Sequence, residues 1–70
     1  MAKDISGKNS GGGLYFEFIA IGVSVKCTAI DPASGMEASV IGPTSALSSD
    51  LEKLAAAKLR RLIEKQNPKN

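Results

Sequence analysis

Apolar and polar residues follow a strand-like pattern in the first half of the chain. Val, Ile, Phe, Tyr and Thr, the residue types that favour strands, gather there in three short runs. We expect the strands over residues 14–21, 24–30 and 36–41. Gly42-Pro43 should end the third strand, because proline has no backbone N–H to donate to a ladder.

The residues between these runs predict two hairpins. Gly22-Val23 fits a two-residue type II′ turn, in which glycine takes the first central position. The second turn is expected over residues 31–35. Asp31 can accept hydrogen bonds from amides ahead of it, Pro32 presets φ, and Gly35 can adopt a positive φ. The three strands should therefore form an antiparallel meander.

The two turns fix a register, and the register separates the side chains into two faces. Ile21 should lie opposite Ser24 and Ala29 opposite Ala38, with side chains alternating between faces along each strand. One face then carries no charge and consists of Phe16, Phe18, Ala20, Val25, Cys27, Ala29, Ala38 and Val40. The other face is mixed and consists of Tyr15, Glu17, Ile19, Ile21, Ser24, Lys26, Thr28, Ile30, Glu37, Ser39 and Ile41.

The second half of the chain has helical periodicity. Ser49 and Glu52 have the spacing of a capping box, so we expect a helix over residues 50–66, ended by Asn67-Pro68. Its apolar stripe consists of Leu51, Leu54, Ala55, Leu59 and Leu62. The predicted fold is α+β: a three-stranded antiparallel β-meander followed by one C-terminal helix that packs on the uncharged sheet face (β-β-β-α).

The 70-residue chain has room for one domain, expected over residues 14–66. Residues 1–13 are polar and end in three glycines, which predicts a flexible tail, and residues 67–70 form a C-terminal tail. Domains of this size are marginally stable, and they usually need a disulfide, a metal or association. With one cysteine and no histidine, an intrachain disulfide and a Cys/His zinc site are excluded. We therefore expect self-association, and no metal or cofactor.

Location follows from the same features. No segment is long and apolar enough to span a bilayer, and the N-terminus lacks the apolar run of a secretory signal. Together with the single cysteine, this predicts a cytoplasmic protein.

The side chains that could do chemistry have simpler structural explanations. Cys27 falls on the uncharged face, and the chain has no histidine to activate it. Asp31 belongs to the second turn, with Glu37 nearby on an exposed face. Three strands and one helix should also leave little volume for a ligand-sized pocket. We therefore predict no catalytic residue and a protein that is not an enzyme.

The mixed sheet face favours protein association. Exposed apolar patches on small domains often mark interfaces, and the outer strands of a sheet offer unpaired backbone groups. The candidate partner-binding residues are Tyr15, Ile19, Ile21, Ile30 and Ile41. We expect a homodimer or a subunit of a larger assembly, joined through this face or through a sheet edge.

A nucleic-acid-binding module is the alternative prediction. Residues 50–70 hold six basic and three acidic side chains, a net charge of +3. The candidate contacts are Lys53, Arg60, Arg61 and Lys65. The mixed face weakens this alternative, because only Tyr15 there could stack on a base.

The run VKCTAIDPASGMEASVIGP, followed by LEKLAAAKLRRLIEK, resembles a small family of bacterial proteins with a domain of unknown function. In that family an aromatic-rich strand leads into an Ala-Ile-Asp-Pro-Ala-x-Gly hairpin, a Gly-Pro step and a closing helix. The resemblance covers about residues 15–65. It implies no activity, cofactor or catalytic residue.

Overall fold

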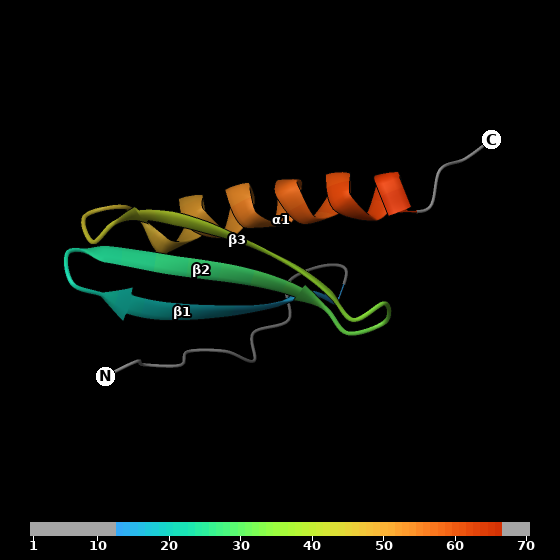
Figure 1. Cartoon of the computed structure of the whole chain (residues 1–70). Helices are drawn as coiled ribbons and strands as arrows, with labels where there is room; N and C mark the ends of the chain where they lie inside the picture. Colours follow the sequence, from blue (N-terminus) through green and yellow to red (C-terminus); the bar gives the residue numbers. More distant parts are fainter. Residues whose placement is uncertain (1–12, 67–70) are drawn as a thin grey trace.

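The computed structural model describes residues 13–66, so the predicted tails lie outside the described residues apart from Gly13. Three strands form one antiparallel sheet in the order β1-β2-β3, and one helix follows them. The elements are β1 (Tyr15–Ile21), β2 (Ser24–Asp31), β3 (Met36–Pro43) and α1 (Ser48–Gln66). Figure 1 shows α1 running along one face of the sheet. The predicted β-β-β-α fold is confirmed.

The predicted register is also confirmed. Ile21 pairs with Ser24 across the first hairpin, and Ala29 pairs with Ala38 across the second. Gly22 has φ +60°, and within residues 13–66 only glycines have a positive φ. Positive φ at the first central position alone is the signature of a type II′ turn.

The second turn is held by the side chain of Asp31. One carboxylate oxygen accepts from the Ala33 amide at 3.2 Å, and the other accepts from the Ser34 hydroxyl at 2.9 Å. The Gly35 amide donates to the Asp31 carbonyl at 2.7 Å, with Gly35 at φ +79°. The turn-forming role predicted for Asp31 is therefore confirmed.

Four element ends differ from the sequence prediction. Strand β1 begins at Tyr15 rather than at residue 14, and β2 ends at Asp31 rather than at residue 30. The two larger differences are at the end of β3 and at the start of α1. Strand β3 continues through Gly42-Pro43, which pair with Val25 and Ser24. Proline is tolerated there because β3 is an edge strand, and the Pro43 nitrogen faces away from β2.

The helix starts earlier than predicted. The Leu47 carbonyl accepts from the amides of Asp50 and Leu51, so α1 begins at Ser48. This places Ser49 inside the first turn, and the prediction that it caps the helix together with Glu52 is wrong. Residues 48 and 49 are both helical, and the chain enters the helix through the Leu47 carbonyl instead.

The core lies between the helix and the uncharged sheet face. Its buried members are Phe16, Cys27, Ala29, Ala38, Leu51, Ala55, Ala56 and Leu59. The predicted helix stripe is wrong at Leu54, which is 58% exposed, and Ala56 is buried instead. Ala20 lies on the predicted core face but is exposed. Both differences arise because α1 packs on β3 and β2 rather than over β1.

Candidate functional site

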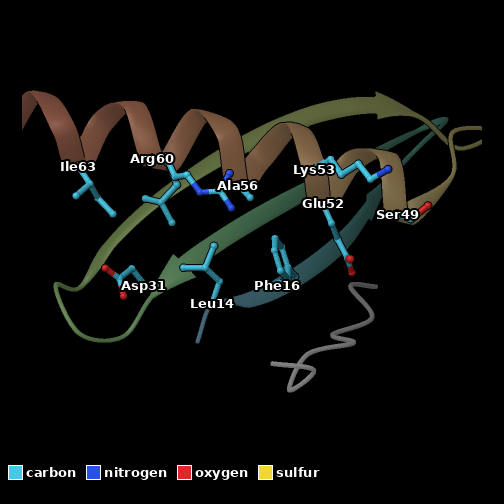
Figure 2. Close-up of a pocket in the computed structure, with 10 residues that line it drawn as sticks. Leu14, Phe16, Asp31, Ser49, Glu52, Lys53, Ala56, Arg60 and Ile63 are labelled. Atoms are coloured by element: carbon cyan, nitrogen blue, oxygen red, sulfur yellow. The ribbon is translucent and has the colours of Figure 1, made fainter. Parts of the chain in front are cut away.

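A groove runs between β1 and α1, since the helix does not cover β1. It consists of two adjoining hollows of about 580 and 450 Å³, which share Phe16 and Glu52. In the larger hollow, Leu14 and Phe16 point from the sheet toward α1 (Figure 2). In the smaller, Phe18 joins Phe16. The expectation that this fold leaves little room for a pocket is therefore wrong.

The rim of the larger hollow carries charges of both signs. Lys53 and Arg60 line it from α1, while Asp31 and Glu52 supply carboxylates. Figure 2 shows the Glu52 side chain reaching from the helix toward the sheet beside Phe16. Because the charges are mixed, the groove has no strong preference for an anionic or a cationic occupant.

The four residues predicted to contact nucleic acid do not share one side of α1. All four are exposed, but only Lys53 and Arg60 line the groove. At 100° per residue, Arg61 and Lys65 lie on the flank of the helix opposite to Lys53 and Arg60. Nucleic-acid binding stays a prediction, with its candidate residues divided between two surfaces.

The five residues predicted to bind a partner share the sheet face opposite α1, as the paired register requires. Tyr15, Ile21 and Ile41 are 39%, 53% and 66% exposed, whereas Ile19 and Ile30 are half-buried. This face is apolar at both ends of the sheet and leaves three large side chains in contact with solvent.

The middle of this open face is polar. Thr28 lies opposite Ser39, and their hydroxyl oxygens are 2.8 Å apart in a hydrogen bond. Thr28 is only 6% exposed, so the hydroxyl pair satisfies a buried polar group. The apolar ends of the face are therefore two separate patches rather than one.

The backbone groups at the free edge of β1 belong to Phe16, Phe18 and Ala20. The two-residue turn makes Ile21 and Ser24 a hydrogen-bonded pair, and such pairs alternate along an antiparallel ladder. The even-numbered residues of β1 therefore direct their N–H and C=O groups away from β2. Among the described residues, nothing pairs with them.

The free edge of β3 is obstructed. The same alternation directs the backbone groups of Glu37, Ser39, Ile41 and Pro43 outward. The Lys58 ammonium donates to the Ser39 carbonyl at 2.8 Å, and Pro43 has no N–H. A lysine and a proline are devices by which proteins protect an edge from pairing.

Residues 11–66 match the family model of a domain of unknown function, DUF6898. The chain belongs to this family. The resemblance noted from the sequence, to a domain of unknown function, is thereby confirmed. No curated protein and no solved structure matches the chain.

The one cysteine of this DUF6898 domain lies in the core. Cys27 is a free thiol with no exposed surface. Burial, with a smaller contribution from the negative charge of Glu52, raises the pKa of the Cys27 thiol to about 11. A thiol that stays protonated is a poor nucleophile, which supports the packing role expected from the sequence.

Within residues 13–66, no cluster of His, Cys, Asp or Glu side chains could hold a metal ion, and no helix could cross a membrane.

Sequence reasoning missed the groove in this DUF6898 domain and the difference between the two sheet edges. Leu14 was assigned to a strand, and Phe16 and Phe18 to a core face covered by the helix. The groove could have been predicted from the width of a helix and the spacing of strands. One helix is about 10 Å across and neighbouring strands are about 4.8 Å apart, so a single helix covers about two strands.

Proposed function

We propose that this domain is a small, non-enzymatic interaction module that self-associates, as a homodimer or as a repeated subunit of a larger assembly. The observation that carries the proposal is the groove beside β1. The hollows of this groove are lined by three apolar side chains of the core layer, Leu14, Phe16 and Phe18. Helix α1, the one helix within residues 13–66, does not fill them.

The size of the domain supports the proposal. Domains of about 60 residues bury only about 60% of the surface of their unfolded chain. Much of the helix–sheet contact in this domain comes from small side chains, since Cys27, Ala29, Ala38, Ala55 and Ala56 are buried. A core of small residues gains little from each side chain, because stabilisation grows with the apolar area buried. Association would cover more apolar surface.

The exposed apolar residues outside the groove point the same way. Ile21 and Val23 are 53% and 82% exposed. Ile21 and Val23 belong to the first hairpin, and the Thr44 amide donates to the Val23 carbonyl at 3.0 Å, which brings the end of β3 beside it. These residues extend the apolar surface of β1 at one end of the sheet.

Mass measurement tests the proposal directly. Sedimentation equilibrium from low micromolar to high micromolar concentration should give a mass at least twice that of the 7.3 kDa chain. The midpoint of thermal unfolding should rise with protein concentration, because association stabilises the folded state by mass action. A mass of one chain throughout this range would refute self-association.

Two alanine variants locate the effect. Phe18→Ala removes a side chain that lines the groove and should weaken association. Leu54→Ala removes an exposed apolar side chain of α1 that lines neither hollow and should leave association unchanged. Equal weakening by both variants would mean that the groove is not the relevant surface.

A further inference from the structure

We propose that two copies pair through β1 in antiparallel orientation to form one continuous six-stranded sheet. The two-fold axis lies midway between Phe18 of one copy and Phe18 of the other. This inference rests on the proposed self-association and names the surface and the geometry that produce it. It requires an edge that is free, a strand that is complementary to itself, and side chains that tolerate the pairing.

The free edge is that of β1. Its outward N–H and C=O groups have no partner within residues 13–66, and no lysine or proline stands in the strand. On β3, by contrast, Lys58 occupies the Ser39 carbonyl and Pro43 lacks a donor. Unpaired edge strands recruit further strands, and pairing between identical edges generates a closed two-fold dimer.

The strand is complementary to itself about its midpoint. Phe18 is the central residue of Tyr15–Ile21, so an axis through Phe18 pairs every residue of β1 with one from the second copy. Phe18 is also one of the residues whose backbone groups point outward. The alignment that uses the full strand is therefore one in which Phe18 and Phe18 of the second copy exchange both hydrogen bonds.

The side chains that face each other in this alignment are compatible in size and charge. On the helix side, Phe16 lies opposite Ala20 of the second copy, so a large residue meets a small, exposed one. On the open side, Glu17 lies opposite Ile19 of the second copy, and Tyr15 lies opposite Ile21. Moving the axis to Glu17 would oppose two like charges, and moving it to Ile19 would place Tyr15 opposite Val23, outside the strand.

The pairing also explains the groove. A second β1 strand, about 4.8 Å beyond the first, would lie along the open side of both hollows and bring its own Phe18 beside the Phe18 that lines the smaller one. Of the partner-binding candidates, Tyr15, Ile19 and Ile21 then stand at the interface. Ile30 and Ile41 lie on β2 and β3, away from the joined edge.

A pair of proline variants tests which edge is used. Ala20→Pro places a residue without N–H at an outward position of β1, which a single copy tolerates and an edge pairing does not. Ile41→Pro does the same at an outward position of β3 and is the matched control. We expect Ala20→Pro to raise the dimer Kd at least about tenfold, since two intermolecular hydrogen bonds per dimer are lost. Ile41→Pro should leave the Kd unchanged, with circular dichroism confirming that both variants fold.

Disulfide trapping tests the alignment independently of the proline variants. In a Cys27→Ala background, which prevents pairing with the native thiol, Phe18→Cys should form a covalent dimer under mild oxidation. Opposed residues of a hydrogen-bonded pair have Cα atoms about 5.5 Å apart, within the range of disulfides. Glu17→Cys and Ile19→Cys should crosslink more slowly, because neither residue lies on the axis.

The outcomes separate the two proposals. A wild-type chain that stays a monomer at high micromolar concentration overturns self-association and the β1 pairing together. A wild-type dimer that Ala20→Pro leaves intact overturns only the pairing through β1. Faster crosslinking of Glu17→Cys or Ile19→Cys than of Phe18→Cys overturns the axis at Phe18.

Discussion

The buried thiol of Cys27 should make this domain less stable at alkaline pH. The pKa of Cys27 rises from 9.0 to about 11 in the folded protein, mainly because burial disfavours the thiolate. The folded state therefore binds the thiol proton more tightly than the unfolded chain does. The stabilisation from this group is fully present below pH 9 and is lost as the pH rises through about 11.

The magnitude follows from the size of the shift. A change of one pKa unit corresponds to about 1.4 kcal/mol, so a shift of about two units is worth about 2–3 kcal/mol in the free energy of unfolding. That is a large fraction of the stability of a domain this small, for which roughly 3–8 kcal/mol is typical. The loss should therefore be measurable well before the chain unfolds completely.

Urea unfolding at a series of pH values measures the effect, and Cys27→Ala provides the reference. Every other ionisable group is present in both proteins, so its contribution cancels in the difference. The wild type should lose about 2–3 kcal/mol more than the variant between pH 8 and pH 11.5. Parallel stability curves for the two proteins would refute the conclusion that Cys27 titrates from a buried, protonated state.

Two further predictions concern the helix packing and the second turn. Leu59→Ala should lower the free energy of unfolding by about 2–5 kcal/mol, because Leu59 is fully buried. Leu54→Ala should change it by less than about 0.5 kcal/mol, because Leu54 is exposed. Similar losses for the two variants in urea titrations would contradict the helix orientation. Asp31→Ala should cost about 1 kcal/mol by thermal unfolding, since its carboxylate accepts two hydrogen bonds in the turn. In a double-mutant cycle with Ser34→Ala the two losses should not add, and strict additivity would mean that the hydroxyl contact contributes nothing.

Most of the sheet could be predicted because its determinants are local. Gly22 and Gly35 supply the positive φ values that the two turns need, and once the turns are placed the alternation of side chains follows. The pairing of Ala29 with Ala38 needed no knowledge of the helix. For the same reason, the role of Asp31 in its turn could be predicted from neighbouring residues alone.

The helix position could not be predicted in the same way. Periodicity allowed both Leu54 and Ala56 near the apolar stripe, and only packing on β2 and β3 decides which one is buried. The start of the helix depended on the Leu47 carbonyl rather than on a side-chain cap. The groove depended on the lateral placement of α1, a tertiary property that no short stretch of sequence encodes.

The hydrogen bond from Lys58 to the Ser39 carbonyl has a consequence for how large an assembly can grow. A sheet with two free edges can add copies indefinitely, and the product is a fibre. In the β1 pairing proposed above, the remaining edge of each copy is the β3 edge that Lys58 obstructs, so strand addition would end at two copies. Removal of the Lys58 side chain would leave the β3 edge of the proposed dimer less protected against the addition of further copies.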